Sequence, residues 1–262
     1  MKIVGAKTKR ILITVKAYPN PSQSKHYSET VCCAGIDLSN YNWIRLYPVP
    51  FRDLEENKQF KKYSIIEVIC GKSDDKRPES YRIREDSISL IEYLDPQRDR
   101  WARRKSIIFR LPIKSYCETI LKQKENGTSL AIVKPSEISF SIEKRKKSDL
   151  KERLRAYAQG SLFERRIKPI EEIPYQFYYH FHCSSDGNCQ GHKLPIIDWE
   201  INQAFRKYLQ LYKDENIALK KIEERWMNIA DGSRHYVYFY VGNQLRFETN
   251  FMVLGVFWPP FD

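Results

Sequence analysis

The sequence has few glycines, and none of them belongs to a recognised phosphate-binding loop. The ten glycines of the 262-residue chain form neither a G-x-G-x-x-G sequence nor a Walker motif. Such loops bring backbone N–H groups close to phosphates, so their absence argues against an ATPase or a dinucleotide-dependent enzyme. A G-x-S-x-G nucleophile elbow is also missing, and nothing indicates a serine hydrolase of that type.

Long apolar segments and a secretory disulfide pattern are absent as well. No apolar run reaches membrane-spanning length, and the first residues, Met-Lys-Ile-Val-Gly-Ala-Lys, lack the core of a signal peptide. The six cysteines include the adjacent pair Cys32 and Cys33, which cannot readily bridge to each other. We therefore expect a cytoplasmic protein with reduced cysteines and no membrane partner.

Positive charge is what the sequence has in excess. Its formal net charge is +12 and its pI is near 9.3. Such a balance favours an anionic partner, most often nucleic acid, although a basic protein without a polyanion partner has the same composition. A hydrophobic content of 42% argues against disorder, and the length allows two domains.

The excess cations are concentrated in two segments. The first, residues 98–110, interleaves cations with an aromatic residue, and the second, residues 143–168, holds ten Lys or Arg against four Asp or Glu. Cations neutralise phosphates, and exposed aromatics stack on unpaired bases by about 1–3 kcal/mol each. Both segments are therefore candidate nucleic-acid-binding surfaces, with a merely solvated charged surface as the alternative. The candidate residues are Arg98, Arg100, Trp101, Arg103, Arg104, Lys105, Lys144, Arg145, Lys146, Lys147, Arg153, Arg155, Arg165 and Arg166.

The N-terminal half has the pattern of a small β-barrel. Short segments rich in β-branched and aromatic residues are separated by turn residues, with little helical periodicity. This pattern is typical of an OB or SH3-like barrel. The expected strands cover residues 11–17, 29–38, 43–49, 63–70, 81–83, 130–133 and 138–142, and one helix is expected over 115–124.

The C-terminal half combines strands with two helices. Strands are expected over 168–181, 235–241 and 251–257, and apolar residues recur at helical spacing from Ile197 to Leu211 and again over 217–229. The sequence thus predicts an α+β, strand-rich protein with two small OB-like β-barrels, a zinc-bound loop and C-terminal helices. The predicted parts are an N-terminal barrel (1–142), a basic linker with a helix around 150–157 (143–168), and a C-terminal β-rich domain (169–262).

A polar loop in this C-terminal half carries candidate metal ligands. Cys183, Cys189 and His192 have the spacing C-x5-C-x2-H, and Gly187 and Gly191 allow tight turns between them. Zinc prefers thiolate and imidazole ligands in tetrahedral geometry, so this loop is a candidate zinc site. Two reduced thiols and some surface histidines are the alternative.

The fourth ligand of such a site would come from the preceding strand. His182 or His180 would complete the coordination sphere. A site closed by four protein ligands leaves no open position for a substrate, which indicates a structural zinc.

Three carboxylates suggest a competing catalytic interpretation. Asp198 and Glu200 follow the loop, Glu29 begins a strand, and such residues can bind Mg²⁺ for phosphodiester cleavage. However, side chains two positions apart on a helix do not face each other. Asp198 at a predicted helix start is better suited to capping that helix.

Several distinctive stretches together span most of the chain: Lys16–Ser22, Tyr27–Cys32, Trp43–Pro50, Cys183–His192 with Asp198-Trp-Glu200, Tyr240–Asn243 and Gly255–Pro260. In these stretches the sequence resembles the bacterial dual-OB domain proteins associated with anti-phage defence loci. The resemblance implies two OB-like barrels and a nucleic-acid sensor. It supplies no catalytic residues.

These observations favour a nucleic-acid-binding sensor or accessory subunit that contacts RNA or DNA and works within a bacterial defence system, where a protein partner is also possible. The first alternative is a metal-dependent nuclease that uses Asp198, Glu200 and Glu29. The second is an assembly subunit whose basic surface docks a protein.

Overall fold

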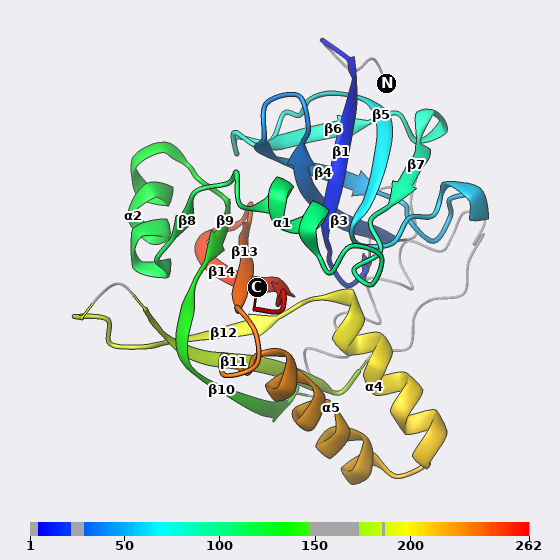
Figure 1. Cartoon of the computed structure of the whole chain (residues 1–262). Helices are drawn as coiled ribbons and strands as arrows, with labels where there is room; N and C mark the ends of the chain where they lie inside the picture. The colour runs from blue at the N-terminus through cyan, green and yellow to red at the C-terminus, as the bar shows by residue number, and fades with distance from the viewer. Residues whose placement is uncertain (1–4, 22–28, 147–172, 185–186, 262) are drawn as a thin grey trace.

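The computed structural model describes residues 5–21, 29–146, 173–184 and 187–261, and it confirms a strand-rich α+β protein. Two seven-stranded sheets lie side by side, the N-terminal one above the C-terminal one in Figure 1. The helix predicted around residues 150–157 falls outside the described residues. None of the helices in the described ranges is long and apolar enough to cross a membrane.

The N-terminal sheet closes into a five-stranded barrel. Its strands follow the order β1-β3-β4-β6-β5, and β5 pairs back with β1. All these pairs are antiparallel except β4–β6, which is parallel. When the five barrel strands are numbered 1 to 5 along the chain, this order is 1-2-3-5-4-1, which is the strand order of an OB barrel. The predicted N-terminal barrel is therefore confirmed. The strands are β1 (Lys7–Lys16), β3 (Glu29–Asp37), β4 (Asn42–Val49), β5 (Ser64–Lys72) and β6 (Ser80–Ile83), with β2 (Asn20–Pro21) on β3 and β7 (Ser89–Tyr93) on β5.

Alternation along the strands fills the barrel with β-branched and aromatic side chains. Ile11, Ile13, Ile44 and Leu46 point inward and are fully buried or nearly so. Strands β1 and β3 approach each other so closely at Gly35 that a Cβ there would lie 2.1 Å from the carbonyl oxygen of Leu12. Only glycine fits this position without moving the backbone.

The C-terminal sheet has the order β10-β11-β12-β14-β13-β9-β8. Its strands are β8 (Ile113–Lys114), β9 (Leu130–Val133), β10 (Pro135–Lys144), β11 (Tyr175–Cys183), β12 (His192–Ile196), β13 (Tyr238–Gln244) and β14 (Phe247–Phe257). The helices are α1 (Ala102–Ile108) beside the barrel, and α2 (Tyr116–Asn126), α4 (Trp199–Tyr212) and α5 (Glu215–Ile229) in the C-terminal half. The two predicted C-terminal helices are therefore confirmed.

The predicted boundary at residue 142 requires correction. The sequence pattern places residues 113–142 in the N-terminal barrel, but β9 pairs with β13, and β10 pairs with β11. Strands β8, β9 and β10 therefore belong to the C-terminal sheet, and the chain passes from one half to the other just after α1. Local pattern marks these segments as strands but does not show which distant strand they pair with.

The outer surface of the barrel is buried against the C-terminal sheet. Leu12 and Ile36 of the barrel belong to one apolar cluster with Tyr240 and Leu254 of the second sheet. Trp43 lies edge-on to Tyr240, with 5.9 Å between the ring centroids. The C-terminal sheet thus covers part of the outer surface of β1 and β3 and packs against Trp43 of β4.

A buried cation joins the same two halves. The Lys62 ammonium lies 2.7 Å from Asp198 Oδ2 and 2.7 Å from Glu200 Oε2, and the side chains of Lys62 and Asp198 are each only 5% exposed. Burial alone would lower the pKa of Lys62, but the two carboxylates outweigh it and raise that pKa above its ordinary value. Backbone contact continues beside this cluster, where Tyr18 N donates to Ile197 O at 2.8 Å.

We predict that Lys62→Ala strongly destabilises the fold. The substitution leaves Asp198 buried without its cation, and breaking a buried pair in this way costs about 3–5 kcal/mol. Urea denaturation should show this loss in the free energy of unfolding. Lys61→Ala removes an exposed lysine one residue away and should change stability by no more than about 0.5 kcal/mol. Equal effects of the two variants would contradict the assignment.

Candidate metal centre and candidate nucleic-acid interface

Four sulfur and nitrogen donors converge at one end of the C-terminal sheet. Cys117 lies in the first turn of α2, Cys183 ends β11, Cys189 lies in the following loop, and His192 begins β12. One ligand atom from each of them lies within 4.8 Å of all the others. The group could hold a metal ion.

Three of the four distances below are close to the edges of a metal-centred tetrahedron, and the fourth is shorter. His192 Nε2 lies 3.1 Å from Cys189 Sγ and 3.4 Å from both Cys117 Sγ and Cys183 Sγ, and the last two sulfurs are 3.7 Å apart. Metal–ligand bonds of about 2.3 Å for sulfur and about 2.0–2.1 Å for nitrogen give tetrahedral edges of about 3.5–3.8 Å. The four side chains are therefore close enough together to bind one ion between them.

Local structure explains how three of these ligands meet. Alternation along β11 places Cys183 on the buried face of the sheet, in phase with Tyr179 and Phe181. The chain then turns at Gly191, whose φ of +84° favours glycine, so that His192 can enter β12 beside Cys183. Tyr116 packs edge-on against the His192 ring, with 4.5 Å between centroids.

The electrostatics of the cluster favour a bound cation. Burial and the neighbouring Cys183 raise the pKa of Cys117 to about 12. For Cys189, burial also acts to raise the pKa, but N–H groups of Cys183 and Gly191 directed at its sulfur hold the pKa below its ordinary value. A cysteine binds a metal ion as its thiolate. A cation here would therefore replace the protons of the three thiols and stabilise the negative charges of the three adjacent thiolates.

The predicted fourth ligand is wrong, and Cys117 takes its place. His180 and His182 occupy even positions of β11 and point to the face opposite Cys183. His180 Nε2 lies 2.8 Å from Ser141 Oγ, and His182 Nδ1 lies 3.2 Å from Glu137 Oε2. His182 instead packs against the loop, since a Cβ on Gly191 would lie 3.0 Å from its Nε2.

Only part of the first basic segment is available to a ligand. Arg104 is buried, donates to Leu94 O at 2.7 Å and stacks on Tyr63, while Trp101 packs against Phe257. These two residues of the predicted set are structural. Tertiary packing overrides the sequence pattern here, because Arg104 is buried and the half-buried Trp101 packs into the apolar cluster between the two halves.

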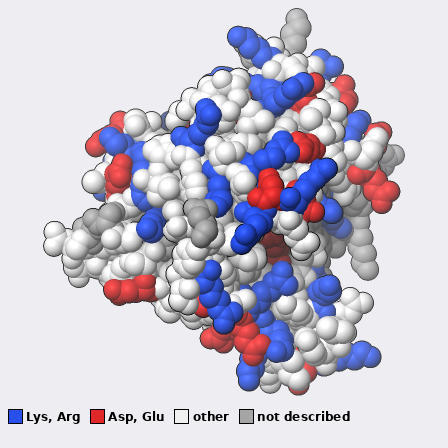
Figure 2. Space-filling model, viewed as in Figure 1, with Lys and Arg blue, Asp and Glu red and all other residues white. Residues whose placement is uncertain are grey.

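The remaining cations of this segment face solvent. Arg98, Arg100 and Arg103 are exposed, and Lys105 is half-buried. Arg103 pairs with both carboxylate oxygens of Glu92. Arg110 is also exposed and lies over the Tyr41 ring at 4.1 Å. Figure 2 shows Lys and Arg over both halves of this face, with Asp and Glu among them.

The second basic segment is described only at its beginning. Lys144 and Lys146 are exposed, and Arg145 is half-buried with its Nε donating to Tyr175 O at 3.1 Å. The other predicted residues, Lys147, Arg153, Arg155, Arg165 and Arg166, lie outside the described residues.

The acidic residues form a helix cap and an ion pair. Asp198 Oδ1 accepts from Glu200 N at 3.1 Å and caps α4, as the sequence predicts. Its other oxygen and the Glu200 carboxylate both contact Lys62. Glu29 begins β3 in the barrel, and its side chain lies outside the described part of the structure. The ammonium of Lys62 therefore lies where a nuclease would place its metal.

Two family profiles match the chain. The profile described as Domain of unknown function (DUF8758) matches residues 7–110, and that described as Domain of unknown function (DUF8757) matches residues 113–262. The boundary between them coincides with the passage from the barrel to the C-terminal sheet. Because the second match covers more than half of the chain, the protein belongs to the DUF8757 family. No curated protein matches the sequence.

We predict that Cys117, not His182, is required for metal retention. Elemental analysis after dialysis against a chelator should find about one metal ion per chain in the parent and in His182→Ala, but much less in Cys117→Ser. Cys32→Ser is the matched control, because Cys32 is a free cysteine remote from the cluster. Metal loss in His182→Ala with full retention in Cys117→Ser would overturn the ligand assignment.

Proposed function

We propose that the protein binds nucleic acid and carries one structural zinc ion, and that it acts as a sensor or accessory subunit without catalysis of its own. The observation that carries this proposal is an OB-order barrel whose adjoining surface presents exposed arginines next to half-exposed aromatic rings. OB barrels bind oligonucleotides through one sheet surface and its loops.

The barrel cannot use the whole of that surface, because the C-terminal sheet covers Leu12 and Ile36 on β1 and β3. The ligand would instead contact the loops of the barrel and the segment after β7. Arg98, Arg100 and Arg110 are exposed there.

Aromatic rings in the same region favour a single strand over a duplex. Phe109 is 39% exposed and packs on Tyr238 and Phe257, while Trp258 is 36% exposed and packs on Trp101. Aromatic rings that pack on the protein at one edge and are exposed at the other can stack on unpaired bases. A duplex does not present unpaired bases. Single-stranded RNA or DNA is therefore the expected ligand.

Zinc is the metal that best suits the cluster. Three thiolates and one imidazole in tetrahedral arrangement form the Cys3His set of structural zinc sites. All four positions would be filled by the protein, which leaves none for a substrate. The ion would hold α2 against the β11–β12 turn, since the ligands come from these elements.

The acidic residues and the family resemblance support the accessory role. A nuclease that used Asp198 and Glu200 would have to displace Lys62 from both carboxylates. The resemblance to dual-OB proteins of defence loci supports a sensor, with a protein partner that carries out the response.

We predict that Arg98, Arg100 and Arg110 neutralise phosphates of the bound strand. Their joint replacement by Gln should weaken binding of a labelled single-stranded oligonucleotide. The slope of log affinity against log salt should become shallower by about 0.7 for each phosphate that the variant no longer neutralises. Fluorescence anisotropy at several salt concentrations, with RNA and DNA tested separately, measures both quantities.

The control variant removes the same charge elsewhere. Arg10, Lys122 and Lys221 are cations paired with nearby carboxylates, and their replacement by Gln also lowers the net charge by three. If this control weakens binding as much as the first variant, the effect reflects overall charge. If the parent binds neither RNA nor DNA, the proposed function is wrong.

A second prediction concerns zinc and stability. Protein purified without chelator should contain about one zinc ion per chain, and its removal should lower the melting temperature because metal binding is coupled to folding of the loop. Calorimetry of the zinc-loaded and zinc-free forms measures the difference. Purified protein without zinc, or with an unchanged melting temperature after zinc removal, would contradict a structural zinc.

A further inference from the structure

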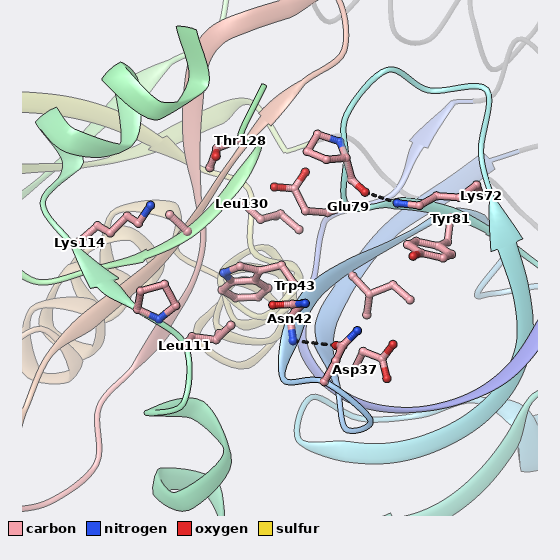
Figure 3. A pocket seen from close by; sticks show the side chains of 15 residues that line it. Asp37, Asn42, Trp43, Lys72, Glu79, Tyr81, Leu111, Lys114, Thr128 and Leu130 are labelled. Carbon is pink, nitrogen blue, oxygen red and sulfur yellow. Dashed lines mark hydrogen bonds between the residues drawn. The ribbon is translucent and has the colours of Figure 1, made fainter. Parts of the chain in front are cut away.

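A pocket of about 360 Å³ lies where the barrel meets the C-terminal sheet (Figure 3). One side is formed by the β3–β4 hairpin and by residues 72–81 at the β5–β6 loop. The other side is formed by residues 111–114 and 128–131, which belong to the C-terminal half. Ligand pockets span about 300–1,000 Å³, so this one suits a ligand of about the size of one nucleotide.

The centre of the pocket is apolar and aromatic. Figure 3 shows the Trp43 indole in the middle, with Leu111 and Leu130 near it on the side of the C-terminal half. Tyr240 supports Trp43 from within the apolar cluster between the halves, so the ring position is fixed by packing. A fixed indole beside aliphatic side chains favours a flat aromatic ligand over a flexible or fully polar one.

Amides line the pocket beside this indole. Asn42 immediately precedes Trp43 in β4, and Asn40 lies in the hairpin turn, where its Oδ1 accepts from Asn42 N at 3.0 Å. Both side chains are exposed. A side-chain amide offers a donor and an acceptor together, which is the combination that pairs with the edge of a nucleobase.

Two lysines lie on opposite sides of the pocket, and both of its carboxylates already have partners. Lys114 and Lys72 lie on either side of Trp43 in Figure 3. Asp37 is paired with Lys9, and Glu79 accepts from Ser129 N at 3.1 Å and from Ser129 Oγ at 2.7 Å. Lys114 Nζ lies 3.9 Å from Glu118 Oε1, and Lys72 Nζ donates to Pro78 O. Either ammonium can also contact a phosphate, and Lys9 reduces the repulsion that Asp37 would exert on it.

We propose that this pocket binds one nucleotide, with the base against Trp43 and the amides and the phosphate near Lys114 or Lys72. The inference deepens the proposed function, because the β5–β6 loop corresponds to the loop that joins strands 4 and 5 of an OB barrel and takes part in oligonucleotide binding. The nucleotide is either a free mononucleotide or one unit of a bound strand.

Isothermal titration calorimetry with AMP, GMP, CMP and UMP tests the free form, and anisotropy with a single-stranded oligonucleotide tests the bound unit. The variant Asn42→Ala with Lys114→Gln changes two solvent-accessible side chains of the pocket and spares Trp43. Its control, Asn216→Ala with Lys122→Gln, makes the same chemical changes at solvent-accessible positions that do not line the pocket.

We expect at least one mononucleotide to bind, and the pocket variant to bind it about tenfold more weakly while the control matches the parent. If no mononucleotide binds but the pocket variant alone weakens oligonucleotide binding, the inference holds with a strand as the source. If mononucleotides do not bind and both variants bind the oligonucleotide like the parent, the pocket inference is wrong and the proposed function stands. If neither ligand binds the parent, both are wrong.

Discussion

The buried pairing of Lys62 with Asp198 and Glu200 is the interaction on which the arrangement of the two halves depends. It brings a barrel residue to the first turn of α4. Trp199, between the two acids, consequently enters the barrel core, where it packs on Phe51 with 5.5 Å between centroids. Because a buried charge is costly without its partner, any arrangement that separated the halves would leave at least one ion unpaired.

A metal ion bound by the Cys3His cluster would impose a second constraint at the other end of the C-terminal sheet. It would tie α2, which follows β8 at one edge of that sheet, to the turn between β11 and β12. The pocket at the junction is lined by residues 111–114 and 128–131, which immediately precede and follow α2. With a metal ion bound, the cluster and the buried ion pair would fix the two sides of the junction by different chemistry.

The sequence predicts elements better than it predicts their partners. Buried and half-buried residues alternate along β11. This alternation places His180 and His182 on the face opposite Cys183, which excludes them as ligands of the same ion. Cys117 could not be found in this way, because its approach to Cys183 depends on the pairing of β8 with β9 and on the path of α2. The boundary between the two halves near residue 110 cannot be predicted from the sequence for a similar reason. Pairing between strands that are far apart in the sequence leaves no local pattern. Trp101 and Arg104 belong to a charged segment, and only tertiary packing distinguishes them from the exposed arginines beside them.

The contact between the barrel and the C-terminal sheet limits how this protein can be divided. The barrel surface that carries Leu12, Ala34 and Ile36 is fully buried by the other half. A fragment cut between the two profile matches would present these side chains to water as one continuous apolar patch, which promotes self-association. The two regions are therefore best regarded as a single folding unit, and recombination that placed either beside an unrelated neighbour would have to supply a new cover for that patch.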